Sequence, residues 1–201
     1  MSHHQRSGYM SHLIACGGLA AAVLTGACGD SVSTTGPSTT SGGASRVKLE
    51  AMVTGRSGSC PTIRFNLGGM RVETNASTQF ALSCDRIVDG APVQADATRM
   101  IGDVLTAGEV ETGDESISDP DFEAEGAIET LSSPGDCTSS GGRTVTIAGL
   151  SLRASSFTDF RDLANGCSGL AVGTNVRARG PLTNPPTAPA LPLRATRVET
   201  R

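Results

Sequence analysis

The stretch Thr144–Leu152, with the sequence TVTIAGLSL, decides the fold of this chain. Its apolar and polar residues alternate up to Ala148 and Gly149, and the alternation resumes in Leu150–Leu152. A period of two is typical of a half-buried β-strand, and a short break that contains Gly is typical of a tight hairpin turn. The stretch therefore predicts two antiparallel strands joined by a tight turn.

The same pattern occurs earlier in the chain, because residues 65–80 align without a gap with residues 145–160. Three further pairs of segments align in the same order: 50–53 with 125–128, 90–95 with 173–178, and 105–111 with 193–199. Self-similarity over this length indicates that one structural unit occurs twice. We therefore predict an internal repeat.

Each copy contains about five short alternating segments, separated by clusters of Gly, Pro, Asn, Asp and Ser at the spacing of strands. A small antiparallel sheet avoids exposed edges best when it curls into a barrel. We therefore predict an all-β fold with two tandem, five-stranded, OB-like β-barrels. The first module is expected at residues 46–111 and the second at 122–201, with an acidic linker at 112–121 between them.

Four cysteines follow the register of the repeat. Cys60 and Cys137 fall between the first and second predicted strands of their copies, and Cys84 and Cys167 precede the fourth. Four cysteines allow three pairings, and the equivalent positions favour Cys60–Cys84 and Cys137–Cys167, one disulfide in each module. The alternative is a four-cysteine metal site, which the absence of C-x-x-C pairs disfavours. We predict neither a metal site nor a cofactor.

Several short motifs occur once in each copy: Thr78–Phe80 and Thr158–Phe160, Gly90–Val93 and Gly173–Val176, Ala107–Val110 and Ala195–Val198. Together with Glu125–Ile128, they resemble a bacterial family known as domain of unknown function 5666. The resemblance covers nearly all of residues 47–200, although Ala51 stands where the family tends to have Gly. It implies a β-rich module that is often repeated in exported lipoproteins, and it implies no active-site residues.

The N-terminal residues 1–27 have the organisation of a secretory signal peptide, because the uncharged apolar stretch Leu13–Ala27 follows a polar segment that carries Arg6. The stretch ends in Leu24–Cys28, which resembles the lipobox of bacterial lipoproteins. We therefore predict lipidation at Cys28, which also accounts for the odd number of cysteines after the leader. The alternative is ordinary secretion, with cleavage after Ala27 and a free thiol.

Residues 28–45 consist almost entirely of Gly, Ser, Thr and other small residues, and they predict a disordered tether between the lipid and the folded part. We therefore expect an exported protein, anchored on the periplasmic or outer face of the bacterial envelope. Its expected partners are the membrane, through the lipid anchor, and an envelope protein or polymer.

Composition excludes several chemistries. His3, His4 and His12 are the only histidines, and all three precede the predicted processing site. Catalysis by Ser-His-Asp or Cys-His groups is therefore excluded, together with the commonest ligand of transition metals. Lys48 is the only lysine. The formal net charge of -4 disfavours a nucleic-acid partner.

Three further features have alternative interpretations. The acidic residues Asp114, Glu115, Asp119 and Asp121 could bind calcium, but without the spacing of a known calcium loop they favour a solvated linker. Arg177 and Arg179 could form a ligand-binding face or simply the outward side of a strand. The insertion 181–192 could be a polyproline ligand or a surface loop.

For the function we predict a non-enzymatic binding or structural module without catalytic residues. The alternative is a carboxylate-based enzyme, or an accessory subunit of an envelope enzyme, because glycosidases work with two carboxyl groups. No pair of acidic residues stands out from the strand pattern. Glu50 and Glu125 occupy equivalent positions in the two copies, and we expect both to be exposed.

Overall fold

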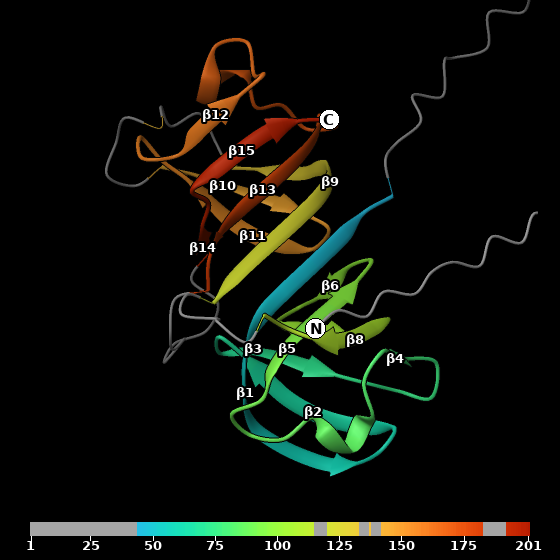
Figure 1. Cartoon of the computed structure of the whole chain (residues 1–201). Coiled ribbons are helices and arrows are strands. Elements are labelled where there is room, and N and C mark those ends of the chain that lie inside the picture. Colours follow the sequence, from blue (N-terminus) through green and yellow to red (C-terminus); the bar gives the residue numbers. More distant parts are fainter. Residues whose placement is uncertain (1–43, 115–119, 133–136, 138–141, 183–191) are drawn as a thin grey trace, which may run out of the picture. The chain divides into compact units, whose positions relative to one another are not determined.

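A computed structural model of the chain describes residues 44–114, 120–132, 137, 142–182 and 192–201 (Figure 1). All of them belong to one compact unit that spans Thr39–Arg201. The predicted signal peptide, Cys28 and the tether up to residue 43 lie outside the described residues. The same is true of residues 115–119 in the predicted linker and 183–191 in the predicted insertion.

Apart from short 3-10 turns, the regular structure of the described residues is β throughout, as the alternating pattern predicts. The strands of the first copy are β1 (Arg46–Ser59), β2 (Thr62–Leu67), β3 (Met70–Glu73), β4 (Gln79–Phe80), β5 (Pro92–Ala97), β6 (Met100–Ile101), β7 (Val104–Thr106) and β8 (Glu109–Thr112). The 3-10 turn η1 (Cys84–Arg86) lies between β4 and β5.

The described part of the second copy has the same order of elements, except that β6 has no counterpart there. Its strands are β9 (Asp121–Leu131), β10 (Arg143–Ile147), β11 (Leu150–Ala154), β12 (Asp159–Arg161), β13 (Asn175–Pro181), β14 (Leu193–Arg194) and β15 (Arg197–Thr200). The 3-10 turn η2 (Gly166–Gly169) lies between β12 and β13, in the place that η1 has in the first copy.

The strand pairings of the two copies are equivalent. In the first copy β2 pairs with β1 and β3, β5 pairs with β1 and β8, and β3 with β7 and β4 with β8 form two parallel pairs. The short strand β6 also pairs with β7, and this pair has no counterpart among the described residues of the second copy. In the second copy β10 pairs with β9 and β11, β13 pairs with β9 and β15, and the parallel pairs are β11 with β14 and β12 with β15. The hydroxyls of Thr78 and Thr158 also donate equivalent hydrogen bonds, to the carbonyls of Ala107 and Ala195 at 2.7 and 2.8 Å. The repeat in the sequence is thus a repeat of strand pairing.

The prediction of two closed five-stranded barrels is wrong. The strands form one open, branched sheet of 15 strands. In the first copy the ladder changes partner at a corner, because Ala107 N–H donates to Glu73 O at 2.9 Å while Gly108 N–H donates to Asp96 O at 2.8 Å. The segments on the two sides of this corner, β7 and β8, therefore pair with different strands, β3 and β5. Ala195 and Thr196 form the same corner in the second copy.

The two copies are joined by antiparallel pairing of β1 with β9, which lie side by side in Figure 1. Arg46 pairs with Glu125, Lys48 with Glu123, and Glu50 with Asp121. Residues 50 and 125 are equivalent in the repeat, and so are residues 46 and 121. If the two copies trade places, the Arg46–Glu125 pair therefore becomes the Glu50–Asp121 pair. The copies are therefore related by a local pseudo-twofold axis at the Lys48–Glu123 pair, with one continuous sheet running through both.

The core also runs through both copies. Val47 and Leu49 of β1 and Phe122 and Ala124 of β9 alternate with the charged residues and are buried, and they belong to one cluster with the buried residues of both copies. The core is mainly aliphatic, as the composition requires. The two modules therefore bury their apolar surface together and do not stand apart as separate tandem domains.

The hairpin turn of each copy lies against the other copy. Met100 N–H donates to Ala148 O at 2.8 Å, and a Cβ atom on Gly149 would overlap the carbonyl oxygen of Met100. Correspondingly, a Cβ atom on Gly68 would overlap the side chain of Leu182. Since β5 and β13 are equivalent strands and these contacts lie just beyond them, the two hairpin contacts are reciprocal. Glycine is required at both turns because there is no space for a side chain.

The structure contains two disulfides, Cys60–Cys84 and Cys137–Cys167, and they are the pairs that the register of the repeat predicts. Each bond connects the loop after the first long strand of its copy to the region of η1 or η2. The sequence separations are 24 and 30. Each copy is thus cross-linked within itself, at the end away from the β1–β9 pair.

Candidate binding site on the polar sheet face

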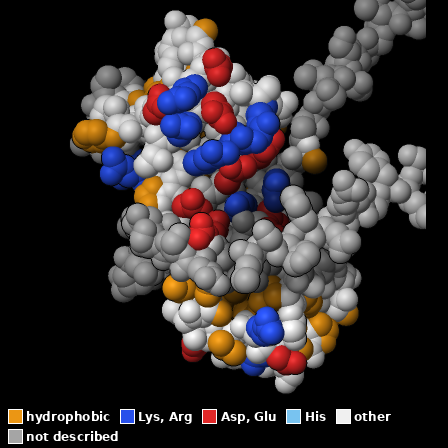
Figure 2. All heavy atoms as spheres, in the orientation of Figure 1, with side chains coloured by type: hydrophobic (Ala, Val, Ile, Leu, Met, Phe, Trp, Pro, Cys, Tyr) orange, Lys and Arg blue, Asp and Glu red, His pale blue; other side chains and the backbone are white. Residues whose placement is uncertain are grey.

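One face of the central sheet carries charged side chains on six neighbouring strands, β8, β5, β1, β9, β13 and β15. The opposite face packs on the core, so the alternation along each strand separates apolar from charged residues. In one row across the sheet, the neighbours in order are Asp96, Lys48, Glu123 and Arg179. In the next row they are Arg46, Glu125, Arg177 and Glu199. Figure 2 shows basic and acidic side chains interleaved over this face.

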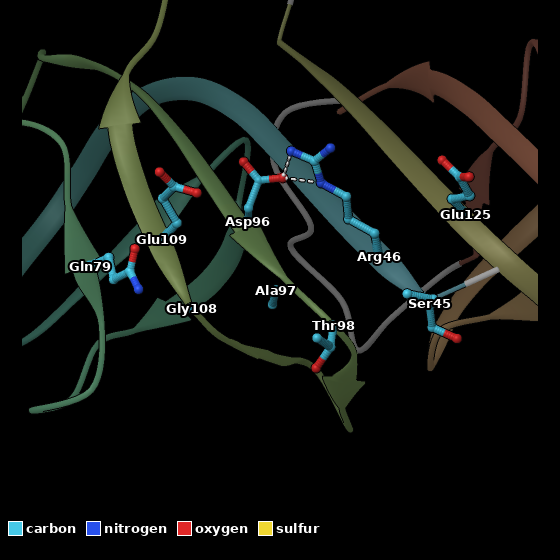
Figure 3. A pocket seen from close by; sticks show the side chains of 10 residues that line it. Ser45, Arg46, Gln79, Asp96, Ala97, Thr98, Gly108, Glu109 and Glu125 are labelled. Carbon is cyan, nitrogen blue, oxygen red and sulfur yellow. Dashed lines mark hydrogen bonds and ion pairs between the residues drawn. The ribbon is translucent and has the colours of Figure 1, made fainter. Parts of the chain in front are cut away.

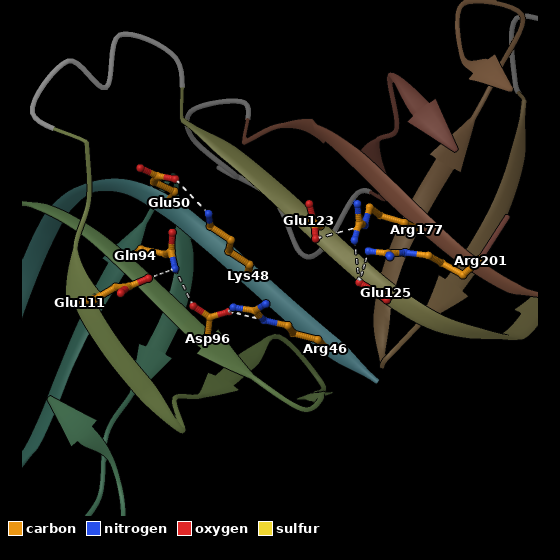
Figure 4. Close-up of polar contacts among 10 residues, drawn as sticks. All are labelled: Arg46, Lys48, Glu50, Gln94, Asp96, Glu111, Glu123, Glu125, Arg177 and Arg201. Atoms are coloured by element: carbon orange, nitrogen blue, oxygen red, sulfur yellow. Dashed lines mark hydrogen bonds and ion pairs between the residues drawn. The ribbon is translucent and has the colours of Figure 1, made fainter. Parts of the chain in front are cut away.

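The arginines of β13 are engaged by acidic residues of their own sheet, and Figure 4 shows Arg177 beside Glu123 and Glu125. Arg177 lies 3.4 Å from both Glu123 and Glu125 and 3.5 Å from Glu199, and Arg179 Nε donates to Glu123 at 2.6 Å. The two arginines do alternate outward along the strand, as the sequence predicts. Their charges are balanced within the sheet, which favours the simpler of the two interpretations, the outward side of a strand.

The first copy places a partly buried polar cluster on the same face. Arg46 Nε donates to Asp96 Oδ1 at 2.6 Å, and Gln94 Nε2 donates to Asp96 Oδ2 at 2.8 Å and also to Glu111. The Asp96 side chain is only 10% exposed, so it depends on these donors in place of water. The hydrogen bond and the charge of Asp96 raise the pKa of Arg46 above its ordinary value.

Beside this cluster lies an open hollow of about 600 Å³. It is lined by Ala44, Ser45, Arg46, Gln79, Asp96, Ala97, Thr98, Gly108, Glu109 and Glu125. Figure 3 shows Gln79 and Glu109 on one side of the hollow, Arg46, Ser45 and Glu125 on the other, and Asp96 between them. The hollow is therefore built from four strands of the first copy and from β9 of the second.

The polar groups of the hollow fall into two kinds. Arg46, Asp96 and Glu125 are held by ion pairs with neighbours. Glu109 has no ion pair within 4 Å among the described residues, and with the Gln79 amide it is available to a ligand. A carboxylate and an amide next to a fixed ion pair suit a ligand that offers hydroxyl or amino groups.

The expectation that Glu50 and Glu125 are exposed is wrong. Their side chains are 18% and 23% exposed, because β1 and β9 are inner strands with a neighbour on both sides. Glu50 lies 3.5 Å from Lys48 and accepts a hydrogen bond from Asp114 N–H at 2.9 Å. It also faces Asp121 across the β1–β9 pair, and loss of hydration together with the charge of Glu50 raises the pKa of Asp121.

The remaining predicted sites are tested only in part. No group of three or more His, Cys, Asp or Glu side chains within the described ranges is arranged to hold a metal ion, and two residues of the calcium alternative, Glu115 and Asp119, lie outside those ranges. The predicted lipidation site, Cys28, also lies outside them. In the described part of the chain, no helix has the length and apolar character needed to cross a membrane.

Comparison with known families gives one result. Residues 53–111 match the family described as Domain of unknown function (DUF5666), and one such domain therefore occupies most of the first copy. The family resemblance is confirmed for these residues, and for the second copy it stays a prediction. Neither a curated protein nor a solved structure matches the chain.

Proposed function

We propose that the protein is an exported, membrane-anchored binding protein without catalytic activity, and that the hollow beside Arg46 and Asp96 holds its ligand. The observation that carries this proposal is the fixed geometry of the hollow. Arg46 and Gln94 hold the Asp96 carboxylate from two sides, so the wall of the site is already organised before a ligand arrives. A preorganised wall lowers the entropic cost of binding.

The ligand is expected to be polar and to carry hydroxyl or amino groups. Glu109 and Gln79 offer an acceptor and an amide, and the hydroxyls of Ser45 and Thr98 line the same hollow. The hollow is open, so it accommodates a segment of an extended polymer as well as a small molecule. An envelope polymer or an envelope protein is therefore the proposed partner.

The proposed location has two supports. Both copies contain a disulfide, and disulfides persist in oxidising compartments outside the cytoplasm. The sequence ending in Cys28 has the features of a lipoprotein leader, and the small-residue stretch that follows it would serve as a tether. We also propose that the second copy is a further member of the family that occupies residues 53–111, on the basis of the equivalent strand pairings.

The alternative function, a carboxylate-based enzyme, has one observation in its favour, since three carboxylates line the hollow: Asp96, Glu109 and Glu125. A glycosidase of the common type needs two of them to act on the substrate. Asp96 is engaged by Arg46, and Glu125 by Arg177 and Arg201. Glu109 alone is left without an ion pair, and this favours binding over catalysis.

The proposal is tested by photo-crosslinking in cells that express the full chain. A photoreactive residue is placed at Glu109 in the hollow, and in a matched control at Arg197, the equivalent position of the second copy. We expect a discrete adduct with an envelope component from position 109 and not from position 197. The same adducts from both positions, or none from position 109, would contradict a ligand site in the hollow.

The enzymatic alternative needs a separate measurement. The purified full chain is incubated with isolated envelope polymer, and the release of soluble fragments is followed for the wild type and for Glu109→Gln. No release by the wild type is expected. Release that disappears in Glu109→Gln would replace the binding proposal with the enzyme.

A further inference from the structure

Two arginines lie side by side on the surface of the second copy without an acidic partner. Arg153 of β11 and Arg194 of β14 are register partners in a parallel pair, so their side chains leave the same face of the sheet. Both residues are exposed. Neither guanidinium forms an ion pair within 4 Å with a described carboxylate. Like charges on directly opposite positions of neighbouring strands destabilise a sheet. A contribution to the stability of the sheet therefore does not explain why these two arginines face each other.

An aromatic ring completes the cluster. The Arg194 guanidinium lies 5.4 Å from the centre of the Phe157 ring, within the range of a cation–π contact. Phe157 is 77% exposed, although aromatic residues are usually buried for the most part. The ring supports the Arg194 side chain, and the Arg194 guanidinium forms no hydrogen bond with the described residues.

The first copy shows what the same place contains when no such cluster is present. The residues equivalent to Arg153 and Arg194 are Glu73 and Thr106, and they are register partners in the same way. Glu73 forms an ion pair with Arg64 at 3.1 Å, and the residue equivalent to Phe157 is Ser77. At this position of the first copy, the charges of Glu73 and Arg64 therefore cancel each other.

Four equivalent positions differ together, because the second copy has Thr144 where the first has Arg64. Thr144 lies beside Arg153 in the β10–β11 pair. The second copy has thus lost the internal ion pair and gained two free guanidinium groups, a supporting ring and a hydroxyl at one place on its surface. Such a coordinated departure within a repeated fold indicates a site rather than a structural requirement.

We propose that Arg153, Arg194 and Phe157 form a binding site for a phosphate group, present only in the second copy. A phosphate group offers several oxygens and up to two negative charges, which match two guanidinium forks better than the single charge of a carboxylate. The site lies on strands other than those that line the hollow and does not depend on the function proposed for it. The phosphate group is carried either by a soluble ester or by the headgroup of an anionic lipid.

The test uses the full chain with Cys28→Ala, so that no lipid anchor contributes. Binding of glycerol phosphate is followed through the NMR signals of the arginine Nε–H groups at low ionic strength. The loss variant combines Arg153→Glu with Arg194→Thr, which are the residues of the first copy. Arg71→Glu is the control, because Arg71 is exposed on β3 and its replacement makes the same change in charge as Arg153→Glu.

We expect saturable shifts of the Arg153 and Arg194 signals, with affinity weakened at least tenfold in the loss variant and less than twofold in Arg71→Glu. A second site is expected in the first copy when it is given the residues of the second, in the combined variant Glu73→Arg, Thr106→Arg and Ser77→Phe. Circular dichroism and the intact disulfides show that each variant is folded. Equal weakening by Arg71→Glu would overturn the proposal, and so would the absence of saturable shifts together with vesicle sedimentation that the loss variant leaves unchanged.

The source of the phosphate is decided with vesicles. A lipid headgroup is identified if the protein sediments with phosphatidylglycerol vesicles and not with phosphatidylcholine vesicles. This sedimentation must also be lost in the variant that combines Arg153→Glu with Arg194→Thr. Binding of glycerol phosphate without sedimentation identifies a soluble ester. If sedimentation is unchanged in the double variant and glycerol phosphate does not bind, the site has no phosphate ligand and the inference is refuted.

Discussion

The reciprocal hairpin contacts predict that Gly149→Ala is unusually destabilising. Gly149 has a φ of 75°, which a residue with a Cβ atom adopts only at a cost of about 1 to 2 kcal/mol. The new Cβ atom would also overlap the carbonyl oxygen of Met100, which belongs to the backbone of the other copy. A backbone atom cannot move away by a change of rotamer, so the hairpin and the Met100 segment have to separate.

The overlap adds roughly 1 to 3 kcal/mol, the usual cost of excess volume in a packed region. The total is roughly 2 to 5 kcal/mol of unfolding free energy, or a decrease in Tm of roughly 4 to 20 °C for a folded unit of this size. Urea unfolding gives the free energy, and calorimetry gives Tm. Because the two copies share a sheet and a core, we expect one cooperative transition that moves as a whole.

Gly102→Ala provides the matched control. Gly102 has a φ of 63°, and a Cβ atom added there meets nothing within 4 Å. Only the backbone cost of about 1 to 2 kcal/mol is expected at this position. The reasoning is refuted if the two variants cost the same within about 0.5 kcal/mol, the size of an ordinary surface effect. Two calorimetric transitions, of which only one moves, would show that the copies unfold independently.

Three other predictions concern single features of the chain. Intact mass without reductant should show no free thiol at Cys60 or Cys84, and replacing both with Ala should cost about 3.5 kcal/mol in urea unfolding, given their sequence separation of 24; a loss that is not measurable would contradict this role. Cys28→Ala should release the protein from membranes, and continued sedimentation with the membrane fraction would refute the anchor. Asp121→Asn should slightly stabilise the protein near neutral pH, because the raised pKa of Asp121 makes its ionised form a penalty in the folded state. Solvent screening of this exposed residue keeps the expected gain below about 0.5 kcal/mol. The penalty disappears as the pH falls below the ordinary pKa of an aspartate, so an equal gain in acid would contradict the cause.

The local structure of this protein could be predicted from the sequence. The hairpin at Thr144–Leu152 follows from alternation and a glycine turn, which involve only neighbouring residues. The disulfides could be predicted because the repeat places Cys60 with Cys137 and Cys84 with Cys167, and equivalent positions form equivalent bonds. Both inferences depend on order along the chain, which the sequence contains directly.

The candidate sites could not be predicted in the same way. Arg46 and Asp96 are far apart in the sequence, and they meet only because β1 pairs with β5 in one particular register. A signal was present in the polar residues that alternate along β5, but alternation does not say which strand lies beside them. Arg153 and Arg194 could have been noticed as departures from the first copy, although only the β11–β14 pairing shows that the departures coincide.

The sequence by itself determined the β character of the chain, the hairpin turns, the repeat and the cysteine pairs, because these depend on the period and spacing of nearby residues. The tertiary structure decided that β1 pairs with β9, that the chain turns a corner just before the last strand of each copy, and that the two copies share one core. Those outcomes depend on which strand edges meet and how much apolar surface they bury together. A strand shows the same alternation whichever neighbour it has, and only the folded chain selects that neighbour.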